Sequence, residues 1–248
     1  MKSFIFKKFK SIILIAIAFL QIGFLSTAAN AATSKPKIYI AGDSTVASYN
    51  AATTSKVGWG QVIPTLFTSD VTFENDALSG RSSKSFIDEG HLKDILNKIK
   101  ANDYLFIQFG HNDQKKNDPT RYTEPYTTYK QYLKKYIDGA KAKKAIPVLV
   151  TPVARLNYKN GKFVNDFADY DKAMKQVATE NNVKLIDLTT KSLNYYTSIG
   201  YDKTYKMFMV SIDGSDRTHF TKEGANQIAK LVAQGVKENK LPISKFVK

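Results

Sequence analysis

The feature that most constrains the fold is a series of apolar, strand-like runs that each end in glycine and polar residues. Residues 37–41, 71–78 and 104–109 are such runs, and a glycine follows each within two positions. Glycine at a strand end lets a ligand approach the main chain closely. Parallel strands present their carboxyl ends at one edge of a sheet, where ligands bind. We therefore expect a ligand site at that edge.

Helical patterns separate these runs from one another. Apolar residues at helical spacing predict helices at 91–100, 126–140, 170–181 and 221–232, and further strands lie at 146–150 and 183–188. Strands alternating with helices predict an α/β fold whose parallel sheet is covered on both faces, although the pattern gives no strand order. We interpret the tyrosines of 126–140 as a buried helix face rather than a sugar-stacking platform.

A short excursion interrupts this alternation at 156–164. Its Asn160-Gly161 pair predicts a tight β-hairpin. We interpret the hairpin either as a flap beside the binding edge or as a loop without a binding role.

The first 31 residues have the composition of a secretion signal. Lysines at 2, 7, 8 and 10 precede an apolar stretch at 11–25, and small residues at 29 and 31 fit a cleavage site. The apolar stretch is shorter than the roughly twenty residues that span a bilayer as a helix. We expect residues 1–31 to be a cleaved signal peptide and residues 32–248 to form one domain of a secreted protein. An uncleaved membrane anchor is the alternative.

Charge and composition restrict the partners. The chain has no cysteine and a formal net charge of +15, so core packing must stabilise it and polyanions attract it. For a secreted protein without a nucleic-acid-binding motif, an acidic polysaccharide or an anionic cell wall is a better partner than nucleic acid. The alternative is a solvated basic surface. No metalloprotease, dinucleotide or P-loop motif occurs, and we expect no metal or other cofactor.

Ser44, at the end of the first strand, is the candidate nucleophile. A serine hydroxyl needs an imidazole to accept its proton and a carboxylate to orient that imidazole. His91 begins a charged helix without a reactive partner nearby, and His111 has no carboxylate in a position to orient it. His219 follows Asp216 by three residues, on a loop before the last helix. We therefore predict Ser44, His219 and Asp216 as nucleophile, base and orienting carboxylate.

Acyl transfer also needs hydrogen-bond donors for the tetrahedral oxyanion. The candidates are the backbone N–H groups of Ser44 and Gly80 and the side-chain amide of Asn112. Each stretch alone has a plain alternative, since residues 42–45 have turn composition, Gly80 suits a hinge and Asn112 suits a turn. A Gly-x-Ser-x-Gly elbow is absent, which argues against an ordinary α/β-hydrolase, while a glycosidase carboxylate pair stays open.

Four blocks, at 42–44, 80, 110–113 and 216–219, resemble in order those of the SGNH (GDSL-type) hydrolases. Thr45, the run 80–83, the 155–164 excursion and the ending 218–221 resemble the rhamnogalacturonan acetylesterases, carbohydrate esterase family 12. The resemblance implies a flavodoxin-like, three-layer α/β/α fold with a five-stranded parallel sheet. It also implies a metal-free esterase that removes acetyl groups from pectin rhamnogalacturonan through an acetyl-enzyme on Ser44. Ser79 stands where that family often has a second glycine, which leaves the shape of the acyl pocket open.

On this basis we take Arg81, His111 and Arg155 as candidate substrate-binding residues and an acetylated, acidic polysaccharide as the partner. The alternatives are an SGNH lipase, thioesterase or deacetylase of xylan or peptidoglycan, and a glycan-binding protein without catalysis. The acetyl position and the oligomeric state stay open.

Overall fold

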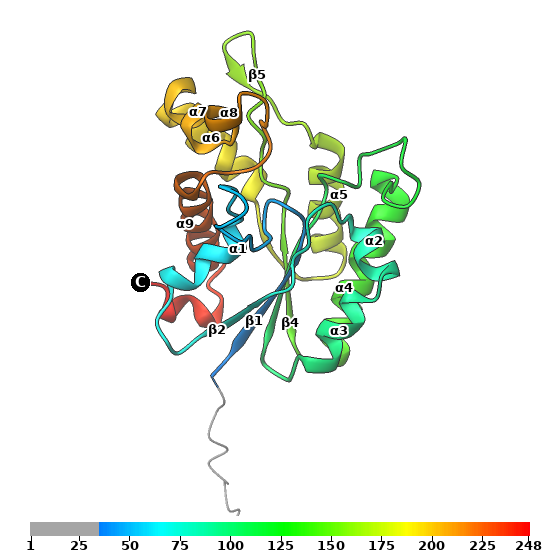
Figure 1. The fold of residues 1–248 in the computed structure, drawn as a ribbon. Helices are drawn as coiled ribbons and strands as arrows, with labels where there is room; N and C mark the ends of the chain where they lie inside the picture. The colour runs from blue at the N-terminus through cyan, green and yellow to red at the C-terminus, as the bar shows by residue number, and fades with distance from the viewer. Residues whose placement is uncertain (1–34) are drawn as a thin grey trace, which may run out of the picture. The chain divides into compact units, whose positions relative to one another are not determined.

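A five-stranded parallel sheet lies at the centre of residues 35–248, the part of the chain that the computed structural model describes (Figure 1). The predicted signal peptide, residues 1–31, lies outside the described residues. The strand order is β2-β1-β3-β4-β7. The strands are β1 (Lys37–Gly42), β2 (Thr72–Asn75), β3 (Tyr104–Gln108), β4 (Ile146–Val150) and β7 (Lys184–Ile186). The predicted five-stranded parallel sheet is confirmed, and the structure supplies the order that the sequence pattern lacked.

Helices cover both faces of the sheet, which confirms the three-layer α/β/α prediction (Figure 1). One face carries α2 (Ser83–Asp88), α3 (His91–Lys98), the π-helical turn η2 (Pro125–Tyr129), α4 (Lys130–Ala142) and α5 (Ala168–Glu180). The other carries α1 (Trp59–Val62), η1 (Ile63–Leu66), α6 (Leu188–Ile199), α7 (Tyr201–Met207), α8 (Val210–Asp213), α9 (Lys222–Glu238) and η3 (Pro242–Phe246). From residue 35 onward, none of the helices combines the length and apolarity that a membrane crossing requires.

The apolar strand runs supply both cores. On β1, Ile38 and Ile40 belong to the core beneath α9, whereas Tyr39 and Ala41 belong to the core beneath α3 and α4. Successive side chains of a strand point to opposite faces, so a strand covered on both sides must be apolar at nearly every position. This explains why the runs are continuous rather than alternating.

The predicted hairpin at 156–164 is present as β5 (Tyr158–Lys159) and β6 (Lys162–Phe163). Asn160 and Gly161 form its turn with positive φ angles of 50° and 76°. The hairpin packs through its aromatic side chains, with the Tyr158 ring 5.0 Å from that of Tyr201 and the Phe163 ring 5.6 Å from that of Tyr196. Its base is therefore fixed to α6 and α7.

The tyrosine stripe is mainly a core face. Tyr129 and Tyr136 are fully buried and donate hydrogen bonds to the backbone oxygens of Phe109 and Ser83, whereas Tyr126 is 41% exposed. The sequence pattern did not predict α2, α7 or α8. All three are short, and a helix of one or two turns carries little periodic signal.

Candidate active site

The polar residues that follow β1, β2 and β3 meet at one edge of the sheet. β1 pairs in parallel with both β2 and β3, with Ile40 beside Asn75 and Gly42 beside Gln108. Beyond the paired residues, the Leu78 N–H donates to the Gly42 oxygen over 3.0 Å. The turns that carry Ser44, Gly80 and Asn112 therefore begin next to one another.

Asp216 and His219 form a hydrogen-bonded pair. The Nδ1 of His219 lies 2.7 Å from Oδ2 of Asp216, while Oδ1 accepts the backbone N–H groups of Thr218 and His219 over 3.0 Å each. A neutral imidazole that donates through Nδ1 carries its lone pair on Nε2, which is the tautomer a general base needs. The three-residue spacing thus closes a tight turn around the carboxylate.

The segment 57–59 connects the Ser44 turn to the His219 loop. The Trp59 N–H donates to the Thr45 oxygen, and the Val57 N–H donates to the Phe220 oxygen, both over 3.0 Å. Thr45 and Phe220 directly follow Ser44 and His219, so the two candidate groups lie on the same side of the molecule. Within residues 35–248, His219 Nε2 makes no hydrogen bond. The Ser44 side chain lies beside the Tyr49 hydroxyl, which donates to the Ser44 backbone oxygen over 2.6 Å.

The electrostatic surroundings favour a neutral imidazole beside an ionised carboxylate. Burial lowers the pKa of His219 below its ordinary 6.5, and Lys56 lowers it further, although Asp216 acts in the opposite direction. Burial also disfavours the Asp216 anion, but the hydrogen bonds from His219 and Thr218 hold the pKa of Asp216 well below its usual range. Lys56 Nζ lies 3.2 Å from Oδ2 of Asp216. Near neutral pH the pair is ready to accept a proton.

Three hydrogen-bond donors remain available at this edge. The N–H groups of Ser44 and Gly80 have no acceptor within residues 35–248, and Gly80 has a φ of 82°, a left-handed conformation that favours glycine. The Asn112 amide donates one hydrogen to the Arg81 oxygen over 3.0 Å, which leaves its second N–H. These are the groups predicted as oxyanion donors.

The structure contradicts the sequence interpretation of His111. Nδ1 of His111 lies 3.1 Å from Oδ2 of Asp43, and the two side chains are only 2% and 0% exposed. His111 thus has an orienting carboxylate. Its side chain is too deeply buried to make the substrate contact that the sequence analysis expected. Sequence reasoning missed this pair because its members are 68 residues apart.

A buried chain of hydrogen bonds extends from this pair. Thr45 Oγ1 donates to Asp43 over 2.7 Å, Gln108 Nε2 donates to Thr45 Oγ1 over 2.8 Å, and Trp59 Nε1 donates to Gln108 Oε1 over 2.9 Å. Burial raises the pKa of Asp43, but the charge and hydrogen bond of His111, together with Thr45, outweigh it and lower that pKa overall. The chain ties the ends of β1 and β3 to α1, and so fixes the turns on either side of Ser44.

Asp113 anchors the turn after Asn112 in a similar way. Its carboxyl group accepts hydrogen bonds from the Ser83 N–H and from the Thr123 hydroxyl, over 3.1 and 2.9 Å. Burial raises the pKa of Asp113 to about 7 despite these bonds. The turn that carries Asn112 is therefore attached to the start of α2.

The two arginines predicted to bind substrate differ in their surroundings. Arg81 is paired with Glu89, with 2.8 Å between Nε and Oε2, on the surface. Arg155 is mostly buried, with its guanidinium 4.9 Å from the centre of the Phe167 ring and Nη2 3.5 Å from the His111 oxygen. Its Nε is buried without a partner in the described chain.

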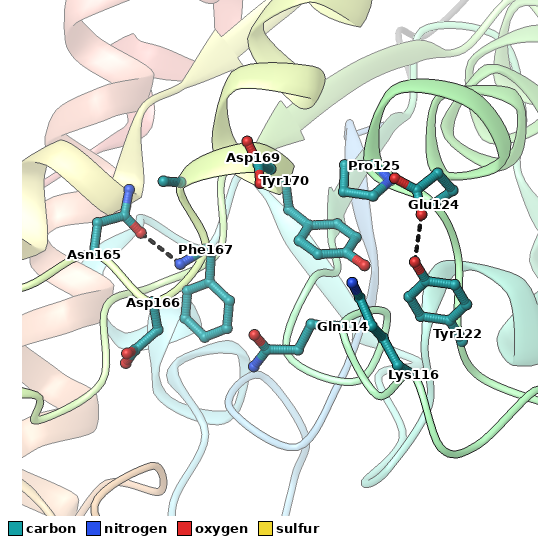
Figure 2. A pocket seen from close by; sticks show the side chains of 11 residues that line it. Gln114, Lys116, Tyr122, Glu124, Pro125, Asn165, Asp166, Phe167, Asp169 and Tyr170 are labelled. Carbon is teal, nitrogen blue, oxygen red and sulfur yellow. Dashed lines mark hydrogen bonds between the residues drawn. The ribbon is translucent and has the colours of Figure 1, made fainter.

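A pocket of about 310 Å³ lies next to this edge (Figure 2). Its wall includes Gln114, two residues after Asn112, and Phe167, whose ring is 4.4 Å from that of His111. The lining residues are Gln114, Lys116, Tyr122, Glu124, Pro125, Asn165, Asp166, Phe167, Ala168, Asp169 and Tyr170. Sequence reasoning missed this pocket because its two walls come from segments about fifty residues apart. No group of three metal-ligating side chains gathers anywhere in residues 35–248.

Comparisons with known proteins identify related sequences and a related fold. A sequence model of the family described as GDSL-like Lipase/Acylhydrolase matches residues 38–232. The probable rhamnogalacturonan acetylesterase YesY of Bacillus subtilis (strain 168) is 55% identical over 210 residues, 85% of this chain and 96% of YesY. The rhamnogalacturonan acetylesterase RhgT of the same organism is 40% identical over 217 residues, 84% of this chain and 92% of RhgT. The crystal structure of YxiM from B. subtilis matches with a TM-score of 0.75 and 31% identity, over 84% of this chain and 58% of that one.

Proposed function

Because the chain belongs to the GDSL-like lipase/acylhydrolase family and is thus a carboxylic ester hydrolase, we propose that it removes O-acetyl groups from pectin rhamnogalacturonan. The names of YesY and RhgT support this substrate. The observation that carries the proposed mechanism is the Asp216–His219 pair, which lies on the same side of the molecule as Ser44 and whose Nε2 has no hydrogen-bond partner in residues 35–248.

In the proposed first half-reaction, Nε2 of His219 accepts the proton of Ser44 as Oγ attacks the acetyl carbonyl carbon. This step requires Oγ and Nε2 to come within hydrogen-bond distance in the substrate complex, where catalytic hydrogen bonds often tighten. The N–H groups of Ser44 and Gly80 and the Asn112 amide stabilise the oxyanion, each worth roughly 3 kcal/mol if well placed. The tetrahedral intermediate then collapses, and the sugar oxygen leaves with the proton from His219.

The second half-reaction releases acetate. Water attacks the carbonyl carbon of the acetyl-enzyme while His219 takes a proton from the water. His219 then gives this proton to Ser44 Oγ as the ester bond breaks. Asp216 stays ionised throughout and stabilises the imidazolium.

The test is acetate release from acetylated rhamnogalacturonan, acetylated xylan and acetylated peptidoglycan by the wild type, Ser44→Ala and the control Ser55→Ala. We expect rhamnogalacturonan to be the best substrate and only Ser44→Ala to be inactive. Equal release by the wild type and Ser44→Ala contradicts the mechanism, and a better rate on another polysaccharide contradicts the substrate. Nitrophenyl esters add a second criterion, because a preference for octanoate over acetate indicates a lipase.

We further propose that the protein is secreted after cleavage near Ala31, on the basis of the amino-terminal signal pattern. Amino-terminal sequencing of the protein from culture medium tests this. A chain that stays with the membrane and begins at residue 1 contradicts it.

A further inference from the structure

Three cationic side chains gather beside the proposed oxyanion donors: Lys115, Arg121 and Arg155. We propose that this cationic cluster binds the carboxylate of a uronic acid residue in the acetylated chain. The inference rests on the proposed function and adds to it the part of the site that selects an acidic chain.

One main-chain contact and two side-chain contacts place the three residues near Asn112 and Gly80. The Lys115 N–H donates to the Asn112 oxygen over 3.2 Å, and Arg155 Nη2 is 3.5 Å from the oxygen of the preceding residue, His111. Arg121 is the side chain nearest to the open side of Gly80, since a Cβ built there would lie 3.8 Å from its Nη1. The cluster thus surrounds the turns that would hold the reacting acetyl group.

The cluster has more positive charge than its ion pairs neutralise. Among residues 35–248, the single carboxylate within ion-pair distance of any of the three cations is Asp118, whose Oδ2 is 3.1 Å from Arg121 Nε. Lys115 and Arg155 have no such partner. Burial, followed by the charges of Arg121 and Arg155, lowers the pKa of Lys115, as expected for cations that repel one another. A bound anion would relieve that repulsion.

Arg155 is the member best prepared for a carboxylate. The Phe167 ring beneath it restricts the guanidinium plane, and its buried Nε has no partner in the described chain. Buried donors without acceptors are unfavourable, and the planar fork of arginine matches the two oxygens of a carboxylate. Both features point to an anionic ligand.

The neighbouring pocket of Figure 2 has the opposite character. Glu124, Asp166 and Asp169 line it against one cation, Lys116. Three carboxylates there would repel a uronate, and one of them, Asp166, also acts on Arg155. The ligand would therefore lie closer to Lys115 and Arg121 than to this pocket. The acidic sugar belongs at the cluster.

The experiment compares acetylated rhamnogalacturonan oligosaccharides with the same oligosaccharides whose carboxylates have been neutralised by methyl esterification. We measure kcat/KM for acetate release. One well-placed charge-assisted pair gives about a tenfold preference, so we expect the wild type to prefer the acidic form at least about tenfold. The preference should fall about threefold in Lys115→Gln and approach one in Lys115→Gln/Arg155→Gln.

Lys143→Gln is the matched control. Lys143 follows α4, at the opposite edge of the sheet, and removing its charge should leave the preference at the wild-type value. The exposed Lys115→Gln variant keeps the test valid if loss of Arg155 impairs folding. A preference that persists in Lys115→Gln and in the double variant overturns the inference. Equal kcat/KM of the wild type for both substrates also overturns the inference, but it leaves the proposed function intact. If the wild type releases acetate from neither, the proposed function fails and takes this inference with it.

Discussion

The Asp216–His219 and Asp43–His111 pairs have similar chemistry and different surroundings. In the first, the His219 and Asp216 side chains are 21% and 17% exposed, and Nε2 is unbonded within the described chain. In the second, the exposed fractions are 2% and 0%, and Nε2 of His111 is buried without a partner among residues 35–248. Each pair lies beside a turn that carries a proposed catalytic group.

The difference suggests a division of labour. A general base must reach the proton that it removes, and a partly exposed imidazole can do so. A fully buried imidazole cannot reach substrate, but its hydrogen bond to a buried carboxylate can fix the main chain on which other groups depend. We therefore assign proton transfer to His219 and positioning to His111, and the predictions below test this assignment.

The largest expected effect is on His219. Replacing it by Asn removes the proposed base, and kcat for nitrophenyl acetate should fall about 10⁵-fold, as in other sites where the residues act as a unit. His91→Asn is the control, because His91 pairs with the partly exposed Glu89 and makes no hydrogen bond to Ser44, Asp216 or His219 within residues 35–248. If kcat of the His219 variant is within tenfold of the wild-type value, another group must be the general base.

Asp216→Asn should come next, with a loss of kcat of about 10⁴-fold. The amide can present N–H to Nδ1, which would move the imidazole proton to Nε2 and block the base. Asp43→Asn is the matched change in the buried pair, and its loss of kcat should be at least ten times smaller. Equal losses of kcat in the two variants would end the distinction between the pairs.

The buried pair should instead dominate stability. His111→Ala leaves Asp43 without its imidazole in the interior, and breaking a buried pair in this way costs about 3 to 5 kcal/mol in the free energy of unfolding. Denaturant titration measures this change. His91→Ala, which breaks a surface pair, should stay within about 1 kcal/mol of the wild type. If the two alanine variants are equally stable, the Asp43–His111 pair does not hold the site together.

The two pairs also show what the sequence can reveal. Asp216 and His219 are three residues apart, so a single turn forms the pair and the spacing alone predicts it. Asp43 and His111 meet because β1 and β3 are neighbours in the sheet. Strand order depends on how the whole chain packs, and the periodicity of each segment does not encode it.

The same reason separates the predicted from the unpredicted parts of the fold. The five strands and the long helices have continuous or periodic apolar patterns that burial requires, so they were predicted. The cationic cluster forms only when residues 115 and 121, which follow β3, lie beside residue 155, which follows β4. The pocket of Figure 2 likewise brings residues 114 and 167 together from these two connections. Such sites become visible after the segments have been placed together.

The smallest effect concerns pH and separates the two imidazoles once more. His219 must be neutral to accept a proton, and its pKa lies below 6.5. The acid limb of kcat/KM should therefore have its midpoint below pH 6.5. Lys56→Gln removes a cation that lowers this pKa, so the midpoint should move to higher pH by less than about one unit.

Lys143→Gln, which removes an equal charge far from the pair, should leave the midpoint unchanged. The same pKa shift predicts how the free energy of unfolding changes with pH. Because folding lowers the pKa of His219, the folded state binds fewer protons than the unfolded state between that pKa and 6.5, and stability falls as the pH drops through this window. His219→Asn should lose that contribution. A midpoint that stays fixed in Lys56→Gln, or moves to lower pH, would mean that an imidazole other than His219 governs the acid limb.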